Sequence, residues 1–246
     1  MPSLEAPHTS ERHPFQRLQT QLAELIALTP AGDRLPTEPE LARRMGVSRA
    51  TLREAMRTFE GQGLIRRRQG VGTFVVSHNH VIESGLEVLQ SIESLAAKIG
   101  LEVTLGTLQV MRLSANQDQA AILSVPEATP LLEVSRVIQA EGRPVAYLID
   151  LLPEEFLTLD DLKDGFTGSV IDFLLRRGSP PLVNSLTEIH AVAASSEIAR
   201  ALEIQRGDVL LMFTARLFSG DGRVVDYSYS YFLPGYFRFH VVRRVG

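Results

Sequence analysis

The sequence predicts an α+β protein with two domains. The N-terminal domain is expected to contain short helices and one β-hairpin, and the C-terminal domain an antiparallel sheet with packed helices. The length of 246 residues allows two modest domains. Apolar residues at helical spacing precede residue 77, whereas several long alternating segments follow residue 85. Charge divides the chain in the same way: residues 41–76 carry 8 Arg and 2 Glu, while the whole chain has a net charge of −4.

Composition limits the classes of protein to consider. Hydrophobic residues make up 44% of the chain, so a sizeable core is available, and there are no cysteines for disulfides or metal sites. No apolar run approaches the ~18 residues of a membrane span, and the N-terminus lacks an apolar signal region. We therefore expect a soluble, cytoplasmic protein. The Arg-rich block in an acidic chain indicates a local anionic partner, because a solvated face normally mixes both signs.

The N-terminal domain is predicted to begin with a helix over residues 11–28. Ser10 is its expected cap, and apolar residues follow at three- and four-residue spacing. Thr37 begins a second, short helix and forms a capping box with Glu40. Gly46 then makes a tight turn into a third helix.

Ser48 caps the third predicted helix, which spans residues 49–62. Its apolar face points inward with Leu52, Ala55, Met56 and Phe59. Its outer face carries Arg49, Ala50, Thr51, Arg53 and Arg57. A hairpin follows, with strands over 64–68 and 73–76 and glycines at its tip that let the backbone approach another molecule closely.

Two helices, a tight turn and a hairpin in this order predict a winged helix-turn-helix. In this fold the second helix of the pair enters a DNA major groove, and the hairpin touches neighbouring phosphate or minor groove. Arginine contacts to phosphate give salt-dependent affinity, and Arg or Thr at base edges gives specificity. The alternative is an ordinary three-helix domain with a solvated Arg face. Such a face would not gather arginines at both the helix start and the hairpin tip.

Residues 78–84 are polar and predict a linker between a domain at 10–77 and a second domain at 85–246. His78 and His80 could suggest a metal site, but no Cys or carboxylate partner lies nearby. We therefore interpret them as solvated and expect no bound metal.

The second domain is predicted to form one antiparallel sheet covered on a face by helices. Turn sequences at 140–143 and 219–222 join successive strands into hairpins. The predicted helices span residues 86–99, 114–123, 169–177 and 195–202. The predicted strands span residues 101–113, 131–139, 144–152, 182–193, 209–218, 223–233 and 237–244.

The stretch LPTEPELARRMGVSRATLREAMRTFEGQGLIRRRQGVGTFV resembles the DNA-binding domain of the GntR superfamily of bacterial transcription regulators. The shared features are the LP-S/T-E opening, GVSRxTxREA across the turn and second helix, GLI after it, and QGxGTFV in the wing. The rest is similar to the UTRA effector domain of the HutC subgroup, which has a chorismate-lyase-like fold. The matching places are the GRP turn, the SVIDFLL helix and the strand VVDYSYSYF.

The resemblance implies DNA contacts at Ser48, Arg49, Thr51, Arg53, Gln69 and Gly70. Arg49 and Arg53 also lie one turn apart on one helix face, which suits a single groove. The family commonly has Arg where this chain has Pro39, so one expected contact is missing. Operator sequence or affinity is therefore expected to differ.

The resemblance also implies effector contacts at Ile92, Glu93, Arg136, Ser169 and Asp226. Relatives that sense phosphorylated amino sugars have two arginines where this chain has Arg136 and Ile138, and a carboxylate where it has Leu148. A buried phosphate with one Arg and a nearby Glu would be poorly compensated. We therefore favour a less charged metabolite over a sugar phosphate.

Other interpretations of these residues stay open. Arg136 could be an exposed strand residue paired with Glu133 or Glu141, and Asp226 could be a cross-strand charge. Three tyrosines alternate with serines along residues 223–233, and Tyr231 is the candidate effector contact among them. They could line a pocket, which mixes apolar walls with a few polar tips, or they could bury a sheet face or an interface.

Together these features predict a ligand-responsive transcriptional regulator, and the resemblance favours a repressor. A homodimer would bind a two-fold-related operator in double-stranded DNA, and a small-molecule effector would shift its two recognition helices. We expect no cofactor and no catalytic residues, since no matched acid/base pair or phosphate-binding Gly loop is present. The rival hypotheses are an enzyme with a lyase-like C-terminal domain and an autoregulatory DNA-binding domain, or a ligand-independent dimeric regulator.

Overall fold

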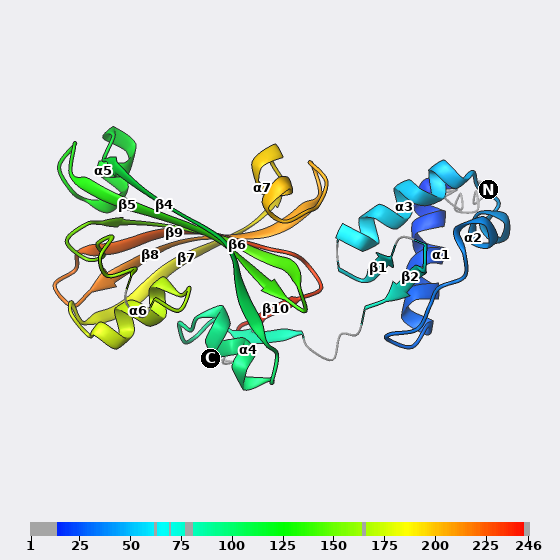
Figure 1. Ribbon diagram of the computed structural model, residues 1–246, viewed down its shortest axis with the longest axis horizontal. Helices are drawn as coiled ribbons and strands as arrows, with labels where there is room; N and C mark the ends of the chain where they lie inside the picture. The colour runs from blue at the N-terminus through cyan, green and yellow to red at the C-terminus, as the bar shows by residue number, and fades with distance from the viewer. Residues whose placement is uncertain (1–13, 62, 69, 77–80, 164–165, 244–246) are drawn as a thin grey trace, which may run out of the picture. The chain divides into compact units, whose positions relative to one another are not determined.

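The computed structural model describes residues 14–61, 63–68, 70–76, 81–163 and 166–243 (Figure 1). The chain divides into two compact units, Met1–Ser77 and His78–Gly246. The first unit is helical with a hairpin, and the second contains a six-stranded sheet with helices, so the protein is α+β as predicted. The predicted cap Ser10, the wing residue Gln69, and both His78 and His80 lie outside the described residues.

The first unit has the predicted order of helices and hairpin. Its elements are α1 Pro14–Leu28, α2 Glu38–Met45, α3 Arg49–Gly61, β1 Ile65–Arg68 and β2 Gly72–Val75. The two strands pair antiparallel, and an isolated bridge between Arg34 and Phe74 attaches the α1–α2 connection to the hairpin. This is the winged helix-turn-helix that the sequence predicts.

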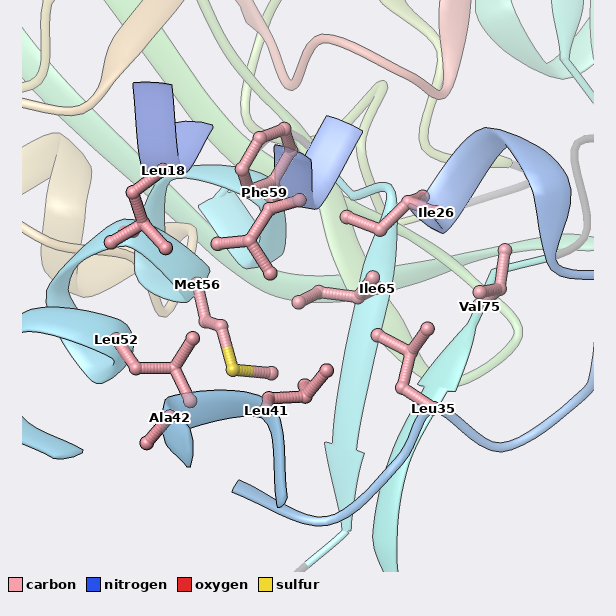
Figure 2. Close-up of a cluster of buried hydrophobic side chains, with 12 residues drawn as sticks. Leu18, Ile26, Leu35, Leu41, Ala42, Leu52, Met56, Phe59, Ile65 and Val75 are labelled. Carbon is pink, nitrogen blue, oxygen red and sulfur yellow. The ribbon is translucent and has the colours of Figure 1, made fainter. Parts of the chain in front are cut away.

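One apolar core joins all parts of this unit (Figure 2). Leu18 and Ile26 come from α1, Leu52 and Met56 from α3, and Ile65 from β1, and each is at most 5% exposed. Burial of such a side chain contributes roughly 1.5–3 kcal/mol, so this core fixes α3 against the other elements. The opposite, polar side of α3 is left facing solvent.

The ends of α2 are set by local chemistry. Thr37 donates from its backbone N–H and its hydroxyl to the Glu40 carboxylate, at 2.9 and 2.7 Å, which confirms the predicted capping box. Gly46 ends the helix in the left-handed conformation, with φ of 66°, which glycine adopts without a Cβ clash. The sharp turn into α3 therefore follows directly from the sequence.

The second unit is built on a six-stranded sheet. Its strands are β4 Val103–Ser114, β5 Pro130–Ala140, β6 Arg143–Pro153, β7 Leu182–Ala193, β8 Val209–Ser219 and β9 Val224–Phe232. Every neighbouring pair is antiparallel, in the order β4-β5-β6-β9-β8-β7. The pairing of β6 with β9 brings two hairpins that are distant in sequence into one sheet.

Helices cover both faces of this sheet, whereas the sequence predicts one covered face (Figure 1). The helices are α4 Ile92–Lys98, α5 Gln117–Leu123, α6 Val170–Arg177 and α7 Ser196–Ala201. α6 shares a core with Leu132 and Val134 of β5, and α5 and α7 share cores with Leu131 and Val137 of the same strand. Neighbouring residues on a strand point to opposite faces, so β5 must be apolar on both sides.

The start of this unit differs from the expected linker and helix. Residues Ile82–Gly85 form strand β3, which pairs in parallel with β10, Phe237–His240. The predicted linker at 78–84 therefore overlaps a strand, because Ile82 is buried in the core beneath α4. The predicted helix at 86–99 begins only at Ile92, because the Ser91 hydroxyl accepts the Ser94 N–H and caps it there.

A smaller difference concerns α5, whose predicted cap is Ser114. Ser114 instead belongs to β4, where it pairs with Pro130 of β5. Asn116 caps the helix, since its side chain accepts the Gln119 N–H at 2.9 Å. Ser and Asn are equally good N-caps, so the sheet register, which includes Ser114 in β4, determines that Asn116 caps α5.

Candidate DNA-binding surface and effector cavity

The predicted DNA-contacting residues of the first unit lie together at the start of α3. Ser48, Arg49, Thr51 and Arg53 are all exposed, whereas Leu52 between them is fully buried. Ser48 accepts the Thr51 N–H at 3.1 Å and contacts its hydroxyl oxygen at 2.8 Å. The helix N-terminus, with its positive dipole end, therefore presents two hydroxyls and two guanidinium groups on one side.

An ion-pair network fixes part of this surface. Glu38 of α2 accepts from Arg53 Nε at 2.7 Å and lies 3.2 Å from Nη2 of Arg67 in β1. The Arg53 side chain is nevertheless 58% exposed, so it can still reach a ligand. One Glu38 carboxylate thus hydrogen-bonds Arg53 of α3 and forms an ion pair with Arg67 of the wing, contacts that sequence spacing alone did not reveal.

The wing tip has the backbone geometry expected of a close approach. Gly70 has φ of +74° and open space where a Cβ would lie, and Gly72 has φ of +141°. A Cβ on Gly72 would lie 2.4 Å from Arg34 Nε, so the flexible Arg34 side chain would have to move, and the positive φ disfavours any residue other than glycine. Arg68 lies over the Phe74 ring at 5.3 Å, which holds its guanidinium at the hairpin.

In the second unit a cavity of about 690 Å³ lies on the sheet face that carries α4 and α6. Its lining includes Ile92, Glu93, Arg136, Ser169 and Asp226, so these predicted effector residues come together at one site. The volume is within the range of small-molecule pockets. The remaining wall is formed by the β3–α4 segment and by strands β6, β7, β8, β9 and β10.

Tyr231 does not line this cavity. It lies in the core beside α7, with its ring 6.4 Å from Tyr147. Ser228 and Ser230 face the cavity instead. The tyrosines and serines of β9 alternate between faces as predicted, but the helices placed the cavity on the serine face.

Arg136 is buried, with 3% exposure, and forms an ion pair with Asp150 on the neighbouring strand. This excludes the alternative of an exposed Arg136 paired with surface glutamates. Asp150 was missed in the sequence, although a lone acid in the apolar run VAYLIDLL is a signal of a buried polar partner.

Asp226 and Glu93 are carboxyl groups withdrawn from solvent, beside the Arg136–Asp150 ion pair. Burial raises the pKa of Asp226 well above its usual range, and the nearby Asp150 carboxylate raises it further. Burial also raises the pKa of Glu93, while the Arg136 guanidinium opposes that shift. Asp226 Oδ1, Glu93 Oε1 and Arg136 Nε are buried without a hydrogen-bond partner among the described residues.

The Ser169 hydroxyl accepts the Asp172 N–H at 3.1 Å and so caps α6. The Asp172 carboxylate in turn accepts from the Ser91 hydroxyl at 2.6 Å. The N-termini of α4 and α6 are therefore tied together at the rim of the cavity. Ser169 combines a structural role with a place in the lining.

The described residues give no sign of two other kinds of site. No group of three or more His, Cys, Asp or Glu side chains among them is arranged to hold a metal ion. In the same part of the chain, no helix has the length and apolar character needed to cross a membrane.

A winged helix-turn-helix with an exposed basic helix, followed by a sheet domain with an internal cavity, defines the class of DNA-binding transcription regulators with an effector domain. Comparison with known proteins agrees. The family described as "Bacterial regulatory proteins, gntR family" matches residues 15–75, and the UTRA domain matches residues 98–238.

Individual relatives are similar over most of their length. The histidine utilization repressor of Klebsiella aerogenes is 31% identical over 76% of this chain and 76% of its own. The transcriptional repressor NagR of Bacillus subtilis is 28% identical, over 80% of this chain and 79% of its own. The crystal structure of PhnF from Mycobacterium smegmatis shares the fold, with a TM-score of 0.61, 21% identity, and coverage of 93% of this chain and 100% of that one.

The chain therefore belongs to the HutC subgroup of the GntR family, whose effector domain is the UTRA domain. Its function follows at that level: it is a DNA-binding transcription regulator with a ligand-binding effector domain.

Proposed function

We propose that this chain represses transcription by binding operator DNA, and that a small metabolite in the cavity changes this binding. The observation that carries the proposal is the position of residues 84–93. They line the cavity, and they follow the DNA-binding unit in the chain by way of residues 78–83. A ligand that fits only one arrangement of this segment favours one arrangement of the attached DNA-binding units.

We place DNA recognition within residues 10–77 and effector binding and dimerisation within 85–246. The proposed DNA contacts are Ser48, Arg49, Thr51, Arg53, Gln69 and Gly70. Exposed arginines at a helix N-terminus support base or phosphate contacts in a major groove, and the open Gly70 supports a close backbone approach in the wing. Because bacterial operator DNA lies in the cytoplasm, we also propose the cytoplasm as the site of action.

The DNA surface is tested by the double variant Arg49→Ala with Arg53→Ala. We expect operator affinity to fall by about 30-fold or more, because each guanidinium contributes roughly 1–3 kcal/mol at a base edge. Gel shifts over a range of salt concentrations measure this loss. Arg200→Ala with Arg206→Ala removes the same charge from exposed positions of the second unit and serves as the control. Equal affinity of the test variant and wild type would refute the assignment.

We propose that the cavity binds its ligand without converting it. This fits a family of transcription regulators and a lining in which the Arg136 guanidinium is already paired with Asp150. Incubation of the full chain with chorismate, followed by assay of released pyruvate, checks the rival lyase activity. Catalytic release of pyruvate would favour the rival hypothesis that the chain is an enzyme.

A further inference from the structure

The charged groups that line the cavity are mostly acidic. Glu87, Glu93, Asp150 and Asp226 are carboxyl groups, and Arg136 is the cation among the described lining residues. Arg136 is itself ion-paired with Asp150. The positive charge is therefore already neutralised, and an anionic ligand would meet further carboxyl groups without a free counter-charge.

In two of these carboxyl groups, one oxygen has no hydrogen-bond partner among the described residues. Asp226 Oδ1 and Glu93 Oε1 are buried and accept no hydrogen bond from a described residue. Asp226 is only 6% exposed as a whole residue. An unpaired buried acceptor costs free energy, and a nearby cation offsets the cost of ionising a buried carboxyl group, so both oxygens favour a ligand that donates hydrogen bonds and carries positive charge.

The same cavity has an apolar wall. Phe213, Phe232 and Phe239 all line it, and their ring centroids lie 4.6–5.1 Å apart. Such an aromatic cluster suits the hydrocarbon or aromatic body of a ligand and also tolerates a nearby cation. Charge and apolar surface are thus both present in the site, in the proportion expected of a small-molecule pocket.

We propose that the effector is an organic cation, an amine or guanidine with an apolar body, whose charged group binds at Glu93 and Asp226. The inference rests on the proposed ligand response of this cavity and names the chemical class of the ligand. Arg136 Nε also has no hydrogen-bond partner among the described residues, so it can donate to an acceptor on the same ligand. The same carboxyl groups disfavour a sugar phosphate as the effector.

A matched series of compounds tests the inference on the full chain. Phenethylamine, 2-phenylethanol and 3-phenylpropanoate share one aromatic body and differ in charge, and glucose 6-phosphate represents sugar phosphates. Thermal shift and calorimetry measure binding. We expect the amine to raise the melting temperature and to bind at least about tenfold more tightly than the alcohol, with weaker binding still by both anions.

Variants assign the binding to the two carboxyl groups. Asp226→Asn and Glu93→Gln keep the side-chain shape and should each weaken amine binding by about tenfold while leaving binding of the alcohol nearly unchanged. Glu127→Gln, at an exposed position outside the lining, is the control and should bind like wild type. If one of the two carboxyl variants fails to fold, the other still tests whether a carboxyl group binds the amine.

The proposal is overturned if either anion binds more tightly than the amine, if both carboxyl variants bind the amine like wild type, or if no amine binding is found up to about 10 mM. Operator gel shifts with the same compounds separate this result from the broader function. If an anion releases the protein from DNA, the proposed ligand response stands, but the proposal of a cationic effector is wrong. If the variant without Arg49 and Arg53 still binds the operator, the proposed DNA-binding surface is wrong, and this conclusion does not depend on whether the amine binds.

Discussion

Glu38 contacts arginines from two elements of the DNA-binding unit, Arg53 of α3 and Arg67 of β1. Exposed ion pairs contribute little to stability, so the value of this network lies in orientation. A planar guanidinium that is held by one carboxylate presents its remaining N–H groups in a defined direction. We therefore propose that Glu38 acts on DNA recognition by orienting Arg53, without touching DNA itself.

Replacement of Glu38 by Gln should reduce specificity more than affinity. The loss of one negative charge strengthens binding to any DNA and steepens the salt dependence by about one unit, while the less oriented Arg53 discriminates poorly. We expect the ratio of operator to scrambled-sequence affinity to fall by about tenfold, as measured by fluorescence anisotropy. Glu54→Gln removes the same charge from α3, where Glu54 pairs with Arg57 at 3.0 Å, and should preserve the ratio. An unchanged ratio in Glu38→Gln would exclude the orienting role.

Asp226 makes stability depend on pH in a defined direction. Its pKa is raised by burial and by Asp150, so above the ordinary Asp pKa of about 3.9 the folded chain binds more protons than the unfolded chain. The free energy of unfolding should therefore decrease as pH rises from that value through the raised pKa. Asp226→Asn cannot lose a proton and should gain stability relative to wild type across this range. Urea unfolding between pH 5 and pH 8 measures the difference, and parallel curves would contradict it.

At the scale of single elements, helix starts are set by side chains that the sequence displays. Ser169 caps α6 and lines the cavity, whereas Ser195 caps α7 on the other face, accepting the Ile198 N–H at 3.3 Å. The two serines thus make the same local contact in different surroundings. They form a natural pair for separating helix stability from effector binding.

Substitution of either serine by Ala should lower the free energy of unfolding by about 1 kcal/mol, the usual loss for an N-cap. Only Ser169→Ala should also change ligand affinity, because Ser195 lies outside the lining. Chemical unfolding and calorimetry on both variants provide the comparison. Equal ligand affinity in the two variants would leave Ser169 with a structural role alone.

At the scale of the whole molecule, we propose that two chains act together on a two-fold-related operator. One α3 offers few base contacts, and a second copy doubles them and fixes their spacing on DNA. Dimerisation also gives the effector an arrangement to change, since a ligand alters DNA affinity only through states that bind DNA differently.

The dimer predicts a sedimenting species of twice the 27.2 kDa chain mass. It also predicts sensitivity to half-site spacing. Insertion of about 5 bp between half-sites turns one of them to the opposite side of the duplex and should weaken binding strongly, whereas about 10 bp restores the shared face. Sedimentation velocity and gel shifts on the spaced operators check both. A monomeric species that binds all the spacings equally would contradict the proposal.

The sequence alone determined the winged helix-turn-helix and most strands of the sheet. The capping box at Thr37, the left-handed turn at Gly46 and the inward face of α3 depend on neighbours within a few residues. The same holds for the alternation of tyrosine and serine on β9. Such local rules can be applied before any tertiary contact is known.

Which residues line the proposed effector cavity depends on tertiary contacts that the sequence does not display. The Arg136–Asp150 pair and the nearness of Asp226 depend on the registers of β5 with β6 and of β6 with β9. The positions of the helices determine that the cavity lies on the serine face of β9. They also determine that Tyr231 lies in a core beside α7. Strand pairing and helix placement join residues that are far apart in sequence, and a period of two along one strand cannot say which face receives them.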